Sequence, residues 1–149
     1  MKFVIQRVLR SELTIDGVVH GKTGKGLVVL VGICDADDET VADRMIRKLT
    51  ALRIFEDANG KTNLDIMDAG GNILFVSQFT LYADCKKGNR PSFFKAGSPE
   101  HANRLYEYML QELHGAFPDV QHGEFGADMK ITLVNDGPFT IVLDSDEIT

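Results

Sequence analysis

The stretch Gly26-Leu27-Val28-Val29-Leu30-Val31-Gly32-Ile33-Cys34 decides the fold expected of this chain of 149 residues. Its apolar run over 27–33 is continuous and is bounded by glycines, whereas a strand with one exposed face alternates apolar and polar residues. A continuous run of this length is typical of a strand buried on both faces. A second such run, Ile73-Leu74-Phe75-Val76, follows Gly70-Gly71. Both runs therefore predict buried strands.

Further strands are expected on both sides of these runs. Residues 2–15 are rich in Val, Ile and Leu and predict one long strand, which the hairpin signal Asp16-Gly17 connects to a short strand over 18–20. Near the other end, apolar and polar residues alternate over 129–133 and again over 139–143, as in half-buried strands.

Two helices are expected. The first is capped by Asp37 or Asp38, and the second begins with Ser98 as N-cap and Pro99 in the first helical position, and ends at Gly115. Their apolar positions recur at helical spacing: Val41, Met45, Leu49 and Leu52 in the first, and Ala102, Leu105, Tyr106, Met109, Leu110 and Leu113 in the second.

Two helices among about seven strands predict an α/β protein with a large mixed sheet. The length suits one domain over 1–149, since domains most often hold about 100–150 residues, and no repeat or linker divides the chain. The acidic tail over 144–149 is expected to fray.

Composition narrows the classes of function. The formal net charge of −6 argues against a general nucleic-acid coat, so an RNA contact would need a local basic patch. The longest apolar stretch, 26–34, is far shorter than the ~20 residues of a membrane helix. The two cysteines form no Cys-x-x-Cys, and the four histidines form no metal-binding pair. We expect neither a metal ion nor a cofactor, and two idle thiols in a reducing cytoplasm.

The segment Ser77-Gln78-Phe79-Thr80 places polar residues where a buried strand should stay apolar. Buried polar side chains are costly unless they are hydrogen-bonded, so this interruption needs a reason. One reason is a site at the strand end, where Ser77 or Thr80 acts as a nucleophile, or where Gln78 and main-chain N–H groups hold an oxyanion. The alternative is a bulge or an edge strand with satisfied hydroxyl groups.

Two other segments carry residues suited to recognition. Lys86, Lys87 and Arg90 surround Gly88, with Lys95 near, and such a loop can approach phosphates closely; the alternative is a plain solvated loop. The segment Asn135-Asp136-Gly137-Pro138 separates two predicted strands; Pro fixes φ and removes a donor there, and the alternative is a plain hairpin turn. Only about 5–6% of X-Pro bonds in folded proteins are cis, so the residues alone do not predict a cis bond there.

Taken together, these segments resemble D-aminoacyl-tRNA deacylases. The resemblance covers essentially the whole chain except the tail past Leu143. The matching segments are Val-Ile-Gln-Arg-Val (4–8), Leu-Arg-Ile-Phe-Glu-Asp (52–57), Ser-Gln-Phe-Thr (77–80), Lys-Lys-Gly-Asn-Arg-Pro-Ser-Phe (86–93), Phe-Gly-Ala-Asp-Met (125–129) and Asn-Asp-Gly-Pro-Phe-Thr (135–140).

The resemblance implies a cytoplasmic homodimer with a three-layer α/β/β fold. It implies hydrolysis of the ester that joins a D-amino acid, or glycine, to the 3′-terminal adenosine of tRNA, with rejection of L-aminoacyl-tRNA. The implied partners are tRNA and a second copy of the chain, with no DNA and no membrane.

The resemblance also implies roles for particular residues. Ser77, Gln78, Phe79 and Thr80 line the pocket for the adenosine and the ester. Asn135, Gly137 and Pro138, with a cis Gly137–Pro138 bond, project into the partner's site and exclude L-amino acids. We expect the tRNA contact at Lys86, Lys87 and Arg90.

One question of mechanism and one of function stay open. Backbone N–H groups near Phe79 and Thr80 are the preferred oxyanion donors, and Thr80 as a covalent nucleophile is the competing mechanism, which lacks a His or Lys base. Two rival functions are a non-catalytic RNA-binding dimer and an esterase for free small molecules.

Overall fold

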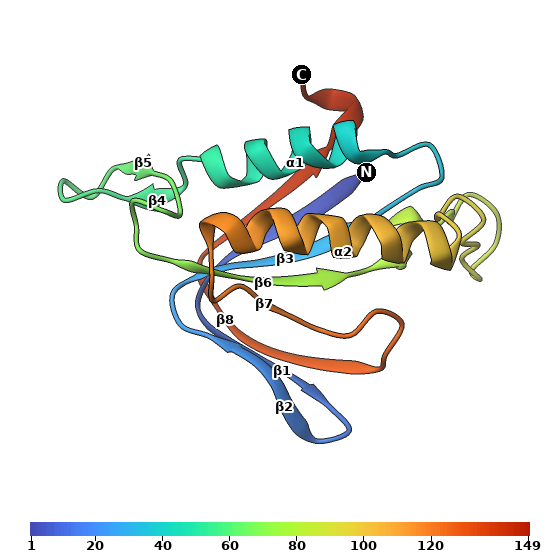
Figure 1. Cartoon of the computed structure of the whole chain (residues 1–149), viewed down its shortest axis with the longest axis horizontal. Helices are drawn as coiled ribbons and strands as arrows, with labels where there is room; N and C mark the ends of the chain where they lie inside the picture. Colours follow the sequence, from blue (N-terminus) through green and yellow to red (C-terminus); the bar gives the residue numbers. More distant parts are fainter.

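The computed structural model describes residues 1–149 and is organised around β1 (Lys2–Ile15). Along one edge, β1 pairs antiparallel with β8 (Met129–Asp144) over nearly its whole length. Along the other edge, its first half pairs with β3 (Gly26–Gly32) and its second half with β2 (Val18–Thr23), both antiparallel. One strand therefore holds three others in place (Figure 1).

The sheet continues from β3 in parallel. β6 (Asn72–Ser77) pairs parallel to β3, and β7 (Gln121–His122) pairs parallel to β6, which completes a mixed sheet in the order β2-β1-β3-β6-β7. A separate two-stranded unit, β4 (Phe55–Glu56) with β5 (Thr62–Leu64), stands apart from this sheet. The predicted α/β class with a mixed sheet is confirmed.

β3 and β6 are buried on both faces, as their apolar runs predict. Alternate side chains such as Val29 and Phe75 belong to a core cluster of 23 residues under α1 (Glu39–Ala51) and α2 (Pro99–Ala116). Both helices cover the same face of the sheet (Figure 1). On the opposite face, the intervening side chains Val28, Leu74 and Val76 form a second cluster together with Val8 and Leu13 of β1.

The segment 135–138 is not a hairpin turn, which corrects that interpretation. β8 runs unbroken from Met129 to Asp144, and its two halves both pair with β1. Val8 pairs with Asn135 and Gln6 with Thr140, so the four residues 136–139 face Arg7 alone. The two alternating stretches are therefore one strand with a large bulge, which locally disrupts the ladder and bends the strand.

Both helices start as predicted, whereas the end of the second helix and the tail differ from expectation. Asp38 is the N-cap of α1 and accepts a hydrogen bond from the Val41 backbone N–H. Ser98 is the N-cap of α2 and Pro99 its first residue, although the Ser98 side chain makes no capping bond, and the helix passes Gly115 to end at Ala116. The tail is not frayed, because Ser145 is buried and its backbone N–H donates to the Met1 carbonyl. No helix is long and apolar enough to cross a membrane.

Substitution of Gly26 tests how closely β3 packs against the start of β6. A Cβ atom at Gly26 would overlap the Asn72 carbonyl oxygen and lie 2.7 Å from the Asn72 nitrogen, and neither backbone atom can move without breaking the ladder. We expect Gly26→Ala to lower the free energy of unfolding in urea by about 3 kcal/mol, the upper end for overpacking. At Gly24 a Cβ meets nothing within 4 Å, so Gly24→Ala is the control and should leave stability unchanged or slightly raised. Equal stability of the two variants would contradict the close approach.

Candidate active site

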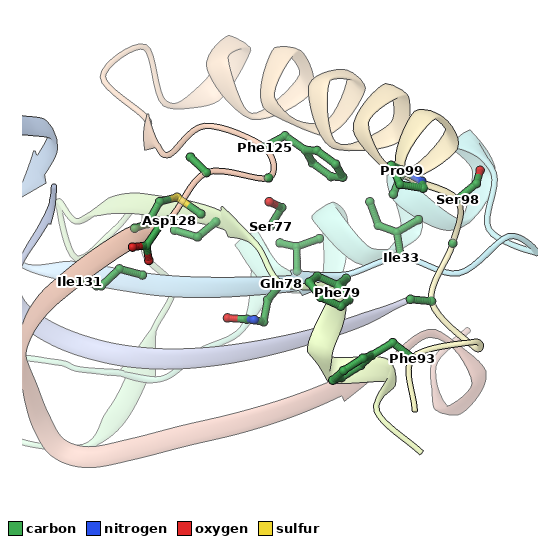
Figure 2. Close-up of a pocket in the computed structure, with 18 of the residues that line it drawn as sticks. Ile33, Ser77, Gln78, Phe79, Phe93, Ser98, Pro99, Phe125, Asp128 and Ile131 are labelled. Carbon is green, nitrogen blue, oxygen red and sulfur yellow. The ribbon is translucent and has the colours of Figure 1, made fainter. Parts of the chain in front are cut away.

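A cavity of about 720 Å³ opens at the carboxyl ends of β3 and β6. This volume lies within the range of small-molecule sites, about 300–1,000 Å³, and the lining is mostly apolar with a few polar groups, as such sites usually are. The segment 125–129 closes it from above, and the start of α2 at Ser98 and Pro99 borders one side (Figure 2). The cavity is thus made by segments far apart in the sequence.

The polar residues after the apolar run of β6 lie where the strand ends. Ser77 is half-buried and pairs with Val31 as the last residue of the ladder, and the Gln78 backbone N–H then donates to the Val31 carbonyl at 2.7 Å. The chain next turns into the short helix η1 (Phe79–Tyr82). β6 pairs with β3 in a regular register, so the bulge alternative does not hold, whereas β7 pairs only with Leu74 and Phe75 and leaves β6 without a partner on that side at Ser77. The Ser77 hydroxyl points into the cavity (Figure 2).

Two backbone donors are free at this turn. The N–H groups of Phe79 and Thr80 lie in the first turn of η1, where amides have no partner within the helix, and neither donates to a loop or side-chain acceptor, although Gln78, Leu81 and Ala83 around them all donate to carbonyls. Ser77, Gln78 and Phe79 line the cavity, and Thr80 follows directly. Adjacent free N–H groups beside a cavity can stabilise negative charge on a reacting oxygen.

The Thr80 hydroxyl lacks the partner that a nucleophile requires. Its oxygen accepts a hydrogen bond from the Gln78 side-chain amide at 2.6 Å, and an amide N–H cannot take a proton from it. Thr80 itself is exposed and is not a lining residue. This geometry favours the backbone donors over the hydroxyl as the reactive feature.

Aromatic rings form much of the cavity wall. Phe79 and Phe93 meet edge to face with ring centroids 5.1 Å apart, and Phe125 covers the cavity from above (Figure 2). The only charged residue in the lining is Asp128, whose carboxylate is 2.8 Å from the Lys130 ammonium at the exposed rim. A flat apolar group with polar substituents, such as a nucleoside, matches this lining.

Tyr106 on α2 contacts both β6, which ends at the cavity wall, and the segment 125–129, which covers the cavity. Its buried hydroxyl donates to the Phe75 carbonyl at 2.6 Å, two residues before Ser77, and its ring stacks on Phe75. The same ring lies 6.2 Å from that of Phe125. Burial raises the pKa of Tyr106, so the hydroxyl stays protonated and remains a donor. The strand end and the covering segment are therefore held by one side chain.

The basic loop lies directly before the cavity wall in the sequence. The backbones of Asp84 and Ser92 exchange two hydrogen bonds and close the loop, which leaves Lys86, Lys87 and Arg90 exposed. The Lys86 backbone N–H and the Lys95 ammonium hold the pKa of Asp84 below its usual range. None of the three cations lines the cavity.

The Gly137–Pro138 segment lies outside the cavity of its own chain. Both residues are exposed, the bond between them is cis, and neither they nor Asn135 contribute to the lining. Asn135 pairs with Val8 in the β1–β8 ladder. One chain therefore does not bring the two predicted motifs together.

Arg7 holds the Gly137–Pro138 segment in place. Its buried guanidinium donates from Nε to the Asp136 carbonyl at 3.1 Å and from Nη1 to the Ile54 carbonyl at 2.7 Å. It also lies 4.7 Å from the centre of the Phe139 ring. Charged hydrogen bonds to buried carbonyls are among the stronger interactions available to a side chain, so the segment is fixed within its own chain.

Comparison with known proteins assigns the family. Residues 4–144 match the family model described as D-Tyr-tRNA(Tyr) deacylase. A protein of Lactobacillus acidophilus named D-aminoacyl-tRNA deacylase is 53% identical over 144 residues, which cover 97% of this chain and 99% of the relative. A protein of the same name from Thermosipho melanesiensis is 46% identical over 149 residues, which cover 99% of each chain. The chain belongs to this deacylase family.

Solved structures agree with the deacylase fold. A structure described as "c-Myc DNA Unwinding Element Binding Protein" is 40% identical, with a TM-score of 0.91 over 97% of this chain and 98% of that one. A structure described as "a probable eukaryotic D-amino acid tRNA deacylase" is only 17% identical, yet it has a TM-score of 0.82 over 95% of this chain and 97% of that one. The second likeness concerns the fold alone.

Part of this deacylase's cavity was not foreseen in the sequence. Phe125 and Asp128 belong to a matching segment to which the residues alone assign no role, and Gly97 to Pro99 read only as a helix start. The one local signal is Gly126, whose φ of +79° marks a turn in the covering segment. Nothing local indicates that this turn lies over Ser77. No group of three or more His, Cys, Asp or Glu side chains is arranged to hold a metal ion.

Proposed function

We propose that this protein hydrolyses the ester bond of D-aminoacyl-tRNA, and that of mischarged glycyl-tRNA, and rejects L-aminoacyl-tRNA. The observation that carries the proposal is the pair of free N–H groups at Phe79 and Thr80 beside an aromatic cavity, in a chain of the deacylase family. The cavity accepts the terminal adenosine with its amino acid, and the products are the free D-amino acid and tRNA.

Hydrolysis of an aminoacyl ester requires little catalysis by side chains. An aminoacyl ester is already activated, and the 2′-hydroxyl of the ribose lies next to it. The Phe79 and Thr80 N–H groups stabilise the oxyanion that forms when water attacks the carbonyl, and one such donor is worth ~10²–10³ in rate. Ser77, whose hydroxyl faces the cavity, orients the substrate rather than attacking it.

Handedness requires a rigid frame. D- and L-amino acids carry the same side chain, so a pocket for that side chain cannot distinguish them. Discrimination therefore needs a rigid group in the protein that clashes with one isomer only. Gly137 and Pro138 provide such a frame, with Asn135 beside them, because Arg7 fixes their segment and both stay exposed. We infer that they enter the cavity of a second copy, hold the α-amino group and occupy the place of an L side chain. The D side chain points outward, so side-chain specificity is broad, and glycine has nothing to exclude.

A homodimer follows from this arrangement, and two features support it. β8 is a long strand whose outer edge pairs with nothing, and such an edge is a ready template for association. Large apolar side chains are exposed on the same two-stranded ribbon, with Leu9 at 54% and Val142 at 67% exposure. We place the dimer in the cytoplasm with a three-layer α/β/β fold, and we place the tRNA contact at Lys86, Lys87 and Arg90, which are exposed beside the cavity wall.

The proposal is tested by comparing four substrates. Purified protein should release tyrosine from D-Tyr-tRNA at least about tenfold faster than from L-Tyr-tRNA, hydrolyse glycyl-tRNA measurably, and leave p-nitrophenyl acetate unchanged. Release of labelled amino acid is the measurement. Binding of tRNA without any deacylation would favour the non-catalytic RNA-binding dimer. Hydrolysis of the free ester at a rate comparable to that of D-Tyr-tRNA would favour the small-molecule esterase.

Variants at Thr80 separate the backbone N–H group from the hydroxyl group. Thr80→Ala removes the hydroxyl and the γ-methyl group but keeps the backbone N–H, and it should keep kcat on D-Tyr-tRNA within about tenfold of the original protein. Thr80→Pro removes the N–H group and should lower kcat by ~10²–10³, because proline has no backbone donor. Urea unfolding of both variants controls for folding. If Thr80→Ala alone lost more than about 10⁴ in kcat, the nucleophile mechanism would replace this one.

The chiral frame is tested by changing Pro138. Pro138→Ala frees the backbone torsion that the ring fixes, so the ratio of the D-Tyr-tRNA rate to the L-Tyr-tRNA rate should fall by about tenfold or more. Pro118→Ala, in an exposed turn, is the control and should keep the ratio. Gly137 is less suitable alone, because a Cβ there lies 3.1 Å from Arg7 Nη2 and its φ is +126°. An unchanged ratio in Pro138→Ala would remove this segment from chiral selection.

A further inference from the structure

An unpartnered aromatic ring stands at the mouth of the cavity. Phe94 is 73% exposed, more than any other large hydrophobic side chain of the protein. The ring of its neighbour Phe93 meets that of Phe79 edge to face, whereas the Phe94 ring has only the Lys95 ammonium near it, 5.8 Å from its centre. Both rings line the cavity. Because most of its side chain is exposed, Phe94 offers an aromatic face to a group at the mouth of the cavity, beyond the adenosine.

The backbone hydrogen bonds that close the basic loop keep its cations close to the Phe94 ring. Asp84 N donates to the Ser92 carbonyl at 2.7 Å and Ser92 N to the Asp84 carbonyl at 2.9 Å, so the loop ends two residues before Phe94. The Asp84 carboxylate also lies 3.3 Å from the Lys95 ammonium on the other side of Phe94. The loop cations, Lys86, Lys87 and Arg90, form no ion pair. Free positive charge and an open aromatic face are therefore held in one short segment.

We propose that Phe94 and the 86–90 loop form a second nucleotide site, which takes the base and phosphates immediately 5′ of the terminal adenosine. This rests on the proposed function, since it assumes that the adenosine occupies the cavity. Single-stranded nucleic acid is bound by base stacking on aromatic side chains together with cations along the backbone, and this segment supplies both. A second copy of the chain fits less well, because a two-fold contact at this patch would bring two sets of like charges together.

Two substrates separate this site from the cavity. One is D-Tyr-tRNA, and the other is 3′-D-tyrosyl-adenosine, which has no 5′ neighbour. Phe94→Ala should raise KM for D-Tyr-tRNA by about 5- to 150-fold with kcat kept, because stacking is worth ~1–3 kcal/mol per base. For 3′-D-tyrosyl-adenosine the rise in KM should be clearly smaller than for D-Tyr-tRNA, because Phe94 also borders the cavity that holds the adenosine. Phe94→Tyr should restore the KM, and Phe94→Leu, which keeps apolar bulk without a π-face, should not. Met67→Ala, at an exposed hydrophobic side chain in the turn before β6, is the matched control.

A binding measurement makes the test independent of catalysis. Calorimetry of the RNA trinucleotide cytidine-cytidine-adenosine should show tighter binding than adenosine alone, and Phe94→Ala should remove most of that difference. An unchanged difference, equal KM increases on both substrates, or full rescue by leucine would overturn the inference. A change of molecular mass in Phe94→Ala by light scattering would assign the ring to contact between copies and also overturn it. Failure of the unmodified protein to hydrolyse either substrate would instead overturn the proposed function, while the calorimetry would still decide on Phe94.

Discussion

The backbone pairing of β1 along both of its edges is the constraint on which the rest of the structure depends. Its first half is hydrogen-bonded to β3 on one side and β8 on the other, so it cannot move without breaking two ladders. This fixes β3, and β3 fixes β6, whose carboxyl end opens into the cavity. The same pairing forces 136–139 of β8 to bulge opposite Arg7. Both candidate recognition elements are thus placed by one strand.

The proposed reactive feature, the free N–H groups of Phe79 and Thr80, lies where the ladder of β6 ends. β6 pairs with β3 over its whole length, and unpaired donors buried inside a sheet are costly. After Ser77 the chain turns away, and the donors of Phe79 and Thr80 are left without acceptors beside a cavity. The structure therefore needs no strongly perturbed acid or base to create a polar site. It needs only a buried strand that ends at the right place, with Tyr106 holding that end and the covering segment.

Local patterns predicted what local physics controls. The runs at 27–33 and 73–76 predicted strands buried on both faces, and helical spacing located both helices, because burial periodicity is a property of consecutive residues. The bulge at 136–139 and the ordered tail were not predicted, because both depend on partners over 100 residues away in the sequence, Arg7 and Met1. Ser77 was located, yet Phe125 above it was not, since no pattern records which loops meet across a fold.

Within one chain, the Gly137–Pro138 segment lies apart from the Ser77–Thr80 segment. This separation is explained if the contacts that make the chiral frame rigid differ from those through which it selects a substrate. A group that rejects one enantiomer must not yield when the wrong substrate pushes on it, so it must be fixed before it meets the substrate. Arg7 provides this within each chain through bonds to the carbonyls of Asp136 and Ile54, while Gly137 and Pro138 remain exposed. In the proposed dimer, association brings this preformed frame to the free N–H groups of the other copy. Chiral selection would then require assembly, whereas the oxyanion donors are complete in a single chain.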